Sequence, residues 1–299
     1  MSEGSPPSGL VIVDKPADWT SHDVVGRLRR LAGTRKVGHA GTLDPMATGV
    51  LVAGVNRATR LLGHLVLADK EYLSTIRLGS STVTDDAEGD VVSSTPAGHL
   101  TADQIAAAMV PLTGDIQQRP SAVSAIKVDG VRSYTRVRAG ETVELPARPV
   151  RVTAFEVLDV RPDGDVVDVD VRVECSSGTY VRALARDLGE SLGVGGHLTA
   201  LRRTRVGGFG LDEAHTVDAL AESFVMLDLD TVARRAFRSV DVDADTERLV
   251  RTGRALDDLE LGAPGTHAVF APDGTFLALY EPSAHGSRPV AVFATLDRP

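Results

Sequence analysis

The chain has 299 residues, 42% of them hydrophobic and 24% charged, which suits one large core with a small second domain. Its single cysteine, Cys175, excludes an internal disulfide and a multi-cysteine metal site. No apolar run approaches the ~18 residues of a membrane span, and the net charge of −9 argues at first against a nucleic-acid partner.

The charge is unevenly distributed along the chain. Between Lys15 and Gly63, eight basic residues stand against three acidic ones, whereas between Asp212 and Gly262 thirteen acidic residues stand against six basic ones. A basic face on an acidic molecule is compatible with binding of phosphates. Solvated helix faces would give the same pattern, so charge alone leaves both interpretations open.

The N-terminal region predicts a strand followed by a helix. Residues 1–8 are polar and lack the apolar segment of a signal peptide, so we expect a disordered lead-in and a cytoplasmic protein. Residues 9–13, G-L-V-I-V, predict a buried strand. Thr20 to Asp23 offer capping residues ahead of apolar side chains at helical spacing: Val24, Val25, Leu28 and Leu31.

The next stretch, residues 37–49, carries three glycines and one proline in thirteen residues. This density predicts a rigid loop rather than a helix or a central strand. Pro45 fixes its own φ and biases Asp44 towards extended geometry. From these residues alone, Asp44 is either a turn-former or a reactive carboxylate on a rigid mount.

Short strands and helices follow in alternation. We expect a strand over 50–55, a helix over 58–68, a strand over 73–79, a polar connection over 80–90 and a helix from Thr101 to Leu112. A short helix is expected over 133–139. Residues 151–160 and 166–175 alternate apolar and polar residues around a turn, which predicts an antiparallel hairpin with one buried face. An amphipathic helix is expected over 183–193.

The C-terminal part changes in character. Helices are expected over 216–221, 228–236 and 244–252, and short strands over 267–270, 275–280 and 289–294. We therefore expect one domain over 9–236 and a small β-rich domain over 237–299.

Five strings carry a family resemblance. G-H-A-G-T-L-D-P-M-A-T-G, at 38–49, resembles the signature loop G-H-x-G-x-L-D-P-x-A-x-G of the TruB family, the bacterial tRNA pseudouridine-55 synthases, and meets it at each fixed position. D-K-P at 14–16, K-x-Y at 70–72 and S-S-G-T-Y-V-R at 176–182 are similar to further family motifs, as is L-R-R-x-x-x-G at 201–207. In Q-x-P-P-x-Y-S-A-x-K the chain departs from the family, because Ser121 and Val123 replace the second proline and the tyrosine.

The resemblance, of actinobacterial type, implies a fold and an activity. The expected fold is α+β, with a central mixed, largely antiparallel sheet flanked by helices and a PUA-like RNA-binding domain over 237–299. The expected activity is isomerisation of a flipped-out uridine 55 in the T loop of tRNA. The implied site residues are Asp44 as nucleophile, Arg182 as its charge partner, Tyr72 and Tyr180 for base stacking, Leu201 as pocket wall, His39 filling the gap left by the base, and Lys15 with Pro16 as support.

Pseudouridine formation exchanges a C1′–N1 bond for a C1′–C5 bond without a redox change, so the resemblance implies no cofactor and no metal. We expect the T arm of tRNA as partner, a monomer, no membrane and no obligate protein partner. A glycosidase would need a second positioned carboxylate about 5–10 Å away, which no motif supplies. A non-catalytic RNA-binding or tRNA-folding protein of the same fold is the other alternative. For Asp85 and Asp86 loop solvation is the default expectation.

Overall fold

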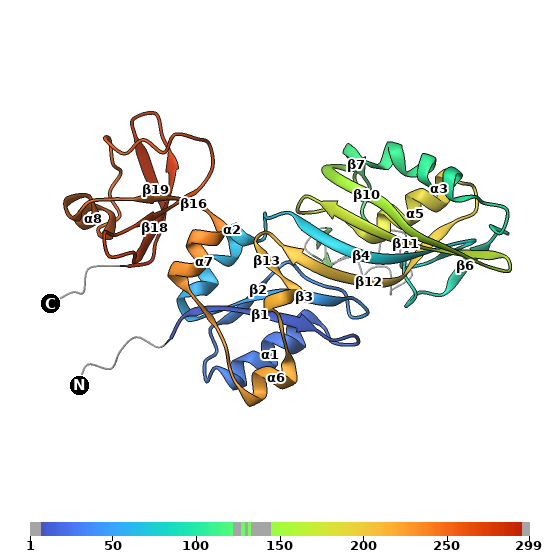
Figure 1. Ribbon diagram of the computed structural model, residues 1–299, viewed down its shortest axis with the longest axis horizontal. Helices are drawn as coiled ribbons and strands as arrows, with labels where there is room; N and C mark the ends of the chain where they lie inside the picture. The colour runs from blue at the N-terminus through green and yellow to red at the C-terminus, as the bar shows by residue number, and fades with distance from the viewer. Residues whose placement is uncertain (1–6, 122–126, 129–130, 133–144, 295–299) are drawn as a thin grey trace.

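The computed structural model describes residues 7–121, 127–128, 131–132 and 145–294 of an elongated α+β molecule (Figure 1). The short helix expected over 133–139, and Val123, lie outside these residues. In the part of the chain that the structure describes, no helix is long and apolar enough to cross a membrane.

Eleven strands of the described residues form one mixed sheet. Its order is β14-β1-β3-β12-β4-β11-β10-β7, with β13 paired to β12, β15 to β1 and β2 to β3. Most neighbours are antiparallel, whereas β1–β14 and β3–β12 are parallel. The strands are β1 (Gly9–Lys15), β2 (Val37–Ala40), β3 (Thr48–Val55), β4 (Lys70–Leu78), β7 (Gly114–Gln118), β10 (Arg148–Asp163), β11 (Val166–Cys175), β12 (Gly196–Val206), β13 (Phe209–Gly210), β14 (His215–Thr216) and β15 (Leu227–Asp228).

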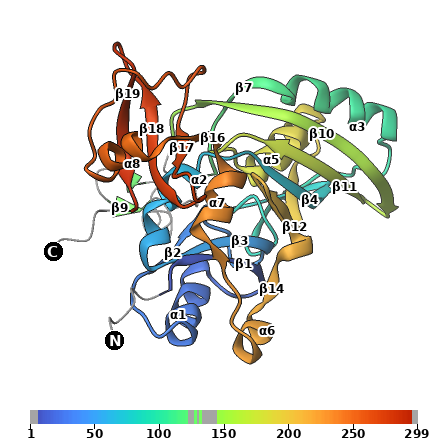
Figure 2. The same ribbon diagram turned by 60° about the vertical axis from the view of Figure 1, so that its left-hand side comes forward.

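Helices cover the two halves of this sheet. α1 (Ser21–Leu31) and α6 (Val217–Glu222) lie against the β1–β3 half, and α3 (Ala102–Met109) and α5 (Val181–Ser191) against the half built from β4 and β10–β12 (Figures 1 and 2). Thr20 caps α1 in a reciprocal box with Asp23, as its sequence predicts. Short 3-10 segments occupy 110–112 (η2) and 211–213 (η3), and the hairpins β5 (Ser80–Thr82)–β6 (Val91–Ser94) and β8 (Lys127–Val128)–β9 (Val131–Arg132) stand outside the main sheet.

Strand alternation divides the apolar residues between two cores. Val11 and Val13 of β1 pack with α1, α3 and α5 in one cluster, while Leu10 and Ile12 face the opposite side. That second cluster joins the sheet to α2 (Leu62–Leu65), α7 (Leu229–Ala236) and the C-terminal strands. β1 is therefore buried on both faces, which explains its uninterrupted apolar sequence.

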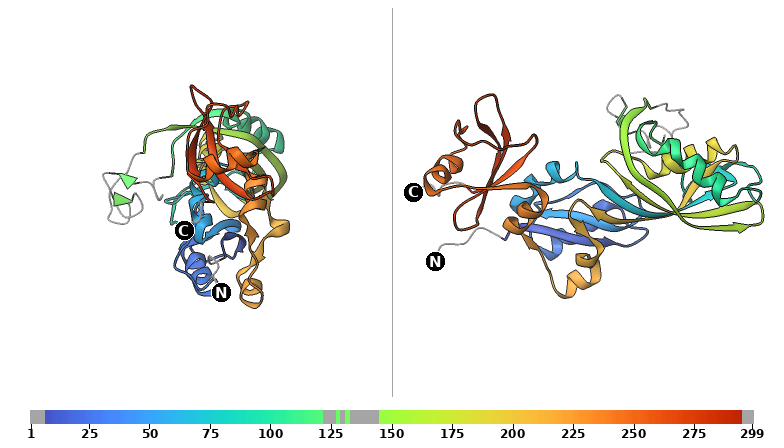
Figure 3. Two further views of the ribbon diagram at one scale, coloured as in Figure 1. Left: turned by 90° about the vertical axis from the view of Figure 1, so that its left-hand side faces the viewer. Right: turned by 45° about the horizontal axis from the view of Figure 1, so that its top comes forward.

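The C-terminal residues form a separate four-stranded sheet, the lobe at one end of the molecule in Figure 3. It contains β16 (Arg238–Asp241), β17 (His267–Phe270), β18 (Phe276–Pro282) and β19 (Ser287–Val292), and α8 (Ala244–Arg251) packs on it. One face of this sheet packs in the core shared with α7 and β1, whereas the other forms a cluster of its own with α8, so the domain division at 236/237 stays a prediction.

Two expectations for local structure were wrong. The glycine-rich stretch is not a loop throughout, because β2 takes Val37–Ala40 and β3 begins at Thr48. β2 is tolerated there since it pairs only with β3. The helix expected over 58–68 is replaced by the 3-10 segment η1 (Asn56–Arg60) and the four-residue α2. Asn56, Thr59 and Gly63 are weak helix formers, and Asn56 has a positive φ of 52°.

Candidate active site

Asp44 lies in the loop between β2 and β3, and close backbone packing fixes this loop. Gly49 has φ +96° and would place a Cβ 2.1 Å from the carbonyl oxygen of Arg203, so glycine is required at this close approach. The amide of Ala47 donates to the carbonyl of Asp44 at 3.1 Å and closes a turn around Pro45. The mount of the carboxylate is therefore rigid, as the sequence predicts.

The buried side chain of Lys15 holds this loop in place. Its side chain is fully buried, and Nζ donates to the carbonyls of Pro16, Trp19 and Pro45 at 2.9, 2.5 and 3.0 Å. Burial lowers the pKa of Lys15 to about 8, against the opposing attraction of Asp44. Lys15 thus supports the loop through carbonyls rather than by lining the pocket, and Pro16 contributes a carbonyl while its ring stays exposed.

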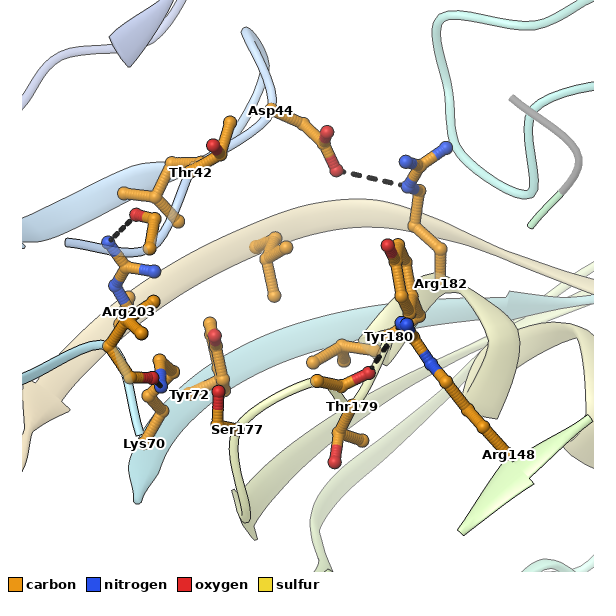
Figure 4. Close-up of a pocket in the computed structure, with 16 residues that line it drawn as sticks. Thr42, Asp44, Lys70, Tyr72, Arg148, Ser177, Thr179, Tyr180, Arg182 and Arg203 are labelled. Atoms are coloured by element: carbon orange, nitrogen blue, oxygen red, sulfur yellow. Dashed lines mark hydrogen bonds and ion pairs between the residues drawn. The ribbon is translucent and has the colours of Figure 1, made fainter. Parts of the chain in front are cut away.

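An ion pair links Asp44 to the start of α5 (Figure 4). Arg182 Nε lies 3.0 Å from Asp44 Oδ2, and Arg182 is only 5% exposed. Its Nη1 donates to the carbonyl of Thr84 at 2.8 Å and lies 3.4 Å from Asp86 Oδ2. A desolvated guanidinium shared by two carboxylates is held far more firmly than a surface arginine.

Asp86 is a site residue that sequence reasoning missed. It is 2% exposed, accepts bonds from the Thr84 hydroxyl and from the amide of Glu88, and pairs with Arg182. Asp85 instead pairs with Arg186, whose Nη1 lies 3.3 Å from Asp85 Oδ2. Loop solvation therefore does not describe either residue. The sequence of this acidic connection does not indicate the contact, because the partner, Arg182, lies about a hundred residues away in the chain.

A pocket of about 340 Å³ opens beside this ion pair. Its wall brings together Asp44, Arg182, Tyr72 of β4, Tyr180 at the N-cap of α5 and Leu201 of β12. Tyr72 is 7% exposed, and burial raises the pKa of its hydroxyl. Five of the residues singled out from the sequence thus surround one cavity.

Tyr180 is held by two residues that sequence reasoning did not single out. Gln118, fully buried at the end of β7, donates from Nε2 to the carbonyl of Tyr180 at 3.0 Å and accepts from its amide at 2.8 Å. The Arg148 guanidinium stacks on the Tyr180 ring, 4.8 Å from its centroid, and donates to the carbonyl of Gly178 at 2.9 Å. The Tyr180 ring is therefore held in place by the bonds that Gln118 makes to the Tyr180 backbone and by the Arg148 guanidinium on one face of the ring.

Two buried cations complete the pocket. Arg203 is 1% exposed, and Lys70 donates from Nζ to the carbonyls of Val66 and Ala68 at 2.9 and 2.6 Å. Burial, with the nearby charge of Arg203, lowers the pKa of Lys70 to about 8. His39 does not line this pocket. It lies on β2 opposite Ala53, with its ring edge-on to His22 at 5.7 Å, and burial lowers its pKa.

Comparisons with known proteins agree along nearly the whole chain. Residues 29–181 match "TruB family pseudouridylate synthase (N terminal domain)", 182–242 match "tRNA pseudouridylate synthase B C-terminal domain", and 237–294 match "tRNA Pseudouridine synthase II, C terminal". A protein of Arthrobacter sp. (strain FB24), named tRNA pseudouridine synthase B, is 60% identical over 296 residues, which cover 96% of this chain and 97% of the relative. A protein of the same name from Nocardia farcinica (strain IFM 10152) is 60% identical over 288 residues, covering 96% and 94%.

Solved structures confirm the expected fold. The chain is similar to one in the "Crystal Structure of a Cbf5-Nop10-Gar1 Complex", with a TM-score of 0.72 and 26% identity over 95% of this chain and 84% of the other. Fold, sequence matches and near full-length relatives lead to one conclusion. The chain belongs to the TruB family of pseudouridylate synthases.

Proposed function

We propose that this chain isomerises uridine 55 in the T loop of tRNA to pseudouridine, with Asp44 as the nucleophile. Its relatives named tRNA pseudouridine synthase B support the tRNA substrate. The observation that carries the nucleophile is the ion pair between Asp44 and buried Arg182 at the pocket wall. A carboxylate that must attack as an anion needs a fixed cation beside it.

The reaction needs one group that attacks and leaves again. The Asp44 carboxylate attacks the uridine at or near C1′, and the C1′–N1 bond breaks. The detached base rotates, C5 bonds to C1′ as the bond to Asp44 breaks, and the C5 proton passes to solvent while N1 gains one. No electrons are exchanged with another reagent, so the residues of this pocket suffice. Arg182 keeps the carboxylate oriented, and the clamp of Lys15 on Pro45 limits its movement.

The pocket walls can hold the flipped uracil. Removing a base from its stack costs a few kcal/mol, and stacking on an aromatic ring contributes about 1–3 kcal/mol. Tyr72 and Tyr180 can therefore offset much of this cost, and Leu201 forms a further part of the wall. Asp86 is already bonded to Thr84, Glu88 and Arg182, so it is poorly placed to act as the free second acid of a glycosidase.

Outside the pocket, His39 is assigned to the RNA rather than to the base. Its Nδ1 is buried and has no hydrogen-bond partner among the described residues, but the residue as a whole is only half-buried, so the rest of the ring can contact RNA. We assign the T arm as the partner and a single chain, in the cytoplasm, as the working unit. The similar Cbf5 chain was solved with Nop10 and Gar1, and we expect no such requirement here.

The test is tritium release from T-arm RNA labelled at C5 of uridine 55 alone. Wild type should release tritium, and Asp44→Asn should bind the RNA with unchanged Kd and release none. Asp90→Asn, the same chemical change at an exposed carboxylate, should release at the wild-type rate. Release by Asp44→Asn would refute the nucleophile. A folded wild type that binds but releases nothing would favour the non-catalytic RNA-binding alternative. Release only from a second RNA, labelled at a different uridine, would show that this other uridine is the target.

A further inference from the structure

We propose that Arg203 is a catalytic residue of this pocket, which stabilises the uracil as an anion once the C1′–N1 bond has broken. The inference rests on the proposed function and deepens it, because it assigns a partner to the charge that leaves Asp44 during the reaction. The described lining of the pocket has an excess of positive charge, since four cations stand against one carboxylate: Lys70, Arg148, Arg182 and Arg203 against Asp44. A neutral uridine does not call for this excess, whereas an anionic base does.

The proposed reaction moves a negative charge from the protein to the base. When the Asp44 carboxylate bonds to C1′ it becomes a neutral ester, and the electron pair of the broken C1′–N1 bond stays on the uracil. This charge is shared by N1 and the two carbonyl oxygens of the ring. When C5 then bonds to C1′, the ester breaks and the charge returns to Asp44. Arg182 pairs with Asp44 and Asp86, so it stabilises the charge before the attack, and a second cation is needed at the base.

Arg203 lies across the cavity from the ion pair of Asp44 and Arg182 (Figure 4). Its side chain is held by backbone, because Nε donates to the carbonyl of Val50 at 2.7 Å and Nη2 to the carbonyl of Gly41 at 2.9 Å. Nη1 donates to no acceptor among the described residues, and Figure 4 shows this terminal nitrogen on the cavity side. The guanidinium is thus fixed in place with one donor left for a ligand.

The charge of Arg203 is not neutralised by the protein around it. Arg203 is only 1% exposed, and the ion pairs of the described residues give it no carboxylate, in contrast to Arg202 and Arg205 on the same strand. Carbonyl groups solvate a guanidinium but leave its net charge, so a positive potential remains in the pocket. In a site shielded from water, such a potential acts most strongly on charge that forms during the reaction.

The direction of attack favours Arg203 over the other cations. An attacking oxygen and a leaving nitrogen stand on opposite sides of C1′, so the base leaves on the side away from Asp44. Arg148 stacks on Tyr180 on the same side of the cavity as Arg182 in Figure 4. Lys70 directs Nζ to two backbone carbonyls, at 2.9 and 2.6 Å. Arg203 therefore presents the free donor on the side that the leaving base occupies.

The kinetic test compares T-arm RNAs with uridine or 5-fluorouridine at position 55 in single turnover, read as loss of the original nucleoside after digestion. Fluorine withdraws electrons from the ring, so this base leaves more easily and depends less on a cation. Arg203→Gln should be about 100-fold slower than wild type on uridine, and its loss on 5-fluorouridine should be at least about fivefold smaller. Arg203→Lys keeps a charge, so its ratio between the two RNAs should stay within about twofold of wild type.

Two comparisons separate this role from support of the Asp44 loop. Both substitutions of Arg203 weaken the bonds to Val50 and Gly41, so loop support alone would slow the two RNAs by the same factor in both variants. That result would overturn the proposal. Arg202→Gln, which removes the neighbouring arginine and its pair with Asp14 outside this pocket, should keep the wild-type ratio.

A binding measurement keeps the proposal testable if Arg203→Gln does not fold. 6-Hydroxyuridine is an anion at neutral pH and resembles the detached uracil in charge and shape. Asp44→Asn carries a neutral side chain, as the ester does, and should bind T-arm RNA with 6-hydroxyuridine at position 55 at least about tenfold more tightly than uridine RNA. Where Arg203→Gln folds, adding it to Asp44→Asn should abolish this preference.

Equal or weaker binding of the anionic RNA by Asp44→Asn, or a preference that survives the loss of the Arg203 charge, would overturn the anion site. Neither result touches the proposed function, which fails only if Asp44→Asn turns over or wild type does not.

Discussion

At the scale of single residues, the site depends on a cation shared between two carboxylates. Arg182 pairs with half-buried Asp44 on one side and with buried Asp86 on the other, so its removal leaves Asp86 without a cation. We predict that Arg182→Met lowers the free energy of unfolding by about 3–5 kcal/mol, the cost of breaking a buried pair on one side. Chemical denaturation measures this change.

The matched control for this prediction is the double variant Arg182→Met with Asp86→Leu. It removes both buried charges, so it should recover most of the lost stability while turnover stays absent. Equal destabilisation by the single and the double variant would show that the charge on Asp86 is not the cause.

A second residue-scale prediction concerns pH. Folding lowers the pKa of Lys15 from 10.5 to about 8, so the folded protein loses this proton near pH 8 and the unfolded chain near 10.5. Through this group alone, stability rises between these pH values, because the folded state no longer carries a desolvated charge. Turnover should move the other way, since a neutral amine has too few donors for three carbonyls.

We therefore expect the single-turnover rate to fall above about pH 8 and the fall to disappear from the much slower Lys15→Met variant. Lys70 has a similarly lowered pKa, so Lys70→Met must be measured in parallel. Lys36→Met, at an exposed lysine, should keep the wild-type profile. If the fall persists in Lys15→Met and disappears in Lys70→Met, Lys70 and not Lys15 causes it, and this prediction is wrong.

At the scale of elements, sequence patterns predict those helices and strands whose stabilising contacts lie within the same segment. The capping box of α1 and the alternation of β10 and β11 lie within their own segments, and both elements formed as expected. The ends of the glycine-rich stretch became strands because pairing with distant backbone outweighed local preference. The family resemblance supplied Asp44 and Arg182. Gln118 opens the Q-x-P-P string, but its side chain bonds the backbone of Tyr180, 62 residues away, and no local pattern predicts that contact.

Gln118 also gives an element-scale prediction, since it joins the end of β7 to the start of α5. Gln118→Leu leaves the amide of Tyr180 unpaired, which should cost about 1–3 kcal/mol, whereas the carbonyl of Tyr180 keeps its bond from the amide of Leu184 at 3.2 Å. Because Tyr180 and Arg182 share this first turn, the rate should fall further than RNA binding. Gln117→Leu, at the exposed neighbour on the same strand, should alter neither. Loss of stability with an unchanged rate would limit Gln118 to a structural role.

At the scale of the whole molecule, the C-terminal sheet is docked on the catalytic part by a few specific contacts. Arg57 donates to the carbonyl of Phe293, and Arg60 lies over the Phe293 ring, 4.9 Å from its centroid. Asp230 of α7 accepts from the amide of Phe276 at 2.6 Å. These contacts surround one shared core, so we expect the two parts to unfold in a single thermal transition.

Phe293→Ala tests this docking at its centre. The ring is 3% exposed and packs on Phe276 and Arg60, so its loss should destabilise the protein by about 3–5 kcal/mol. The pocket lies outside this interface, so the rate at saturating RNA should stay within about twofold of wild type. If the lobe contributes RNA contacts, the Kd for RNA should rise. Val290→Ala, at an exposed side chain of β19, should change neither quantity. A lowered rate with unchanged Kd would instead mean that the lobe acts on the pocket through the shared core.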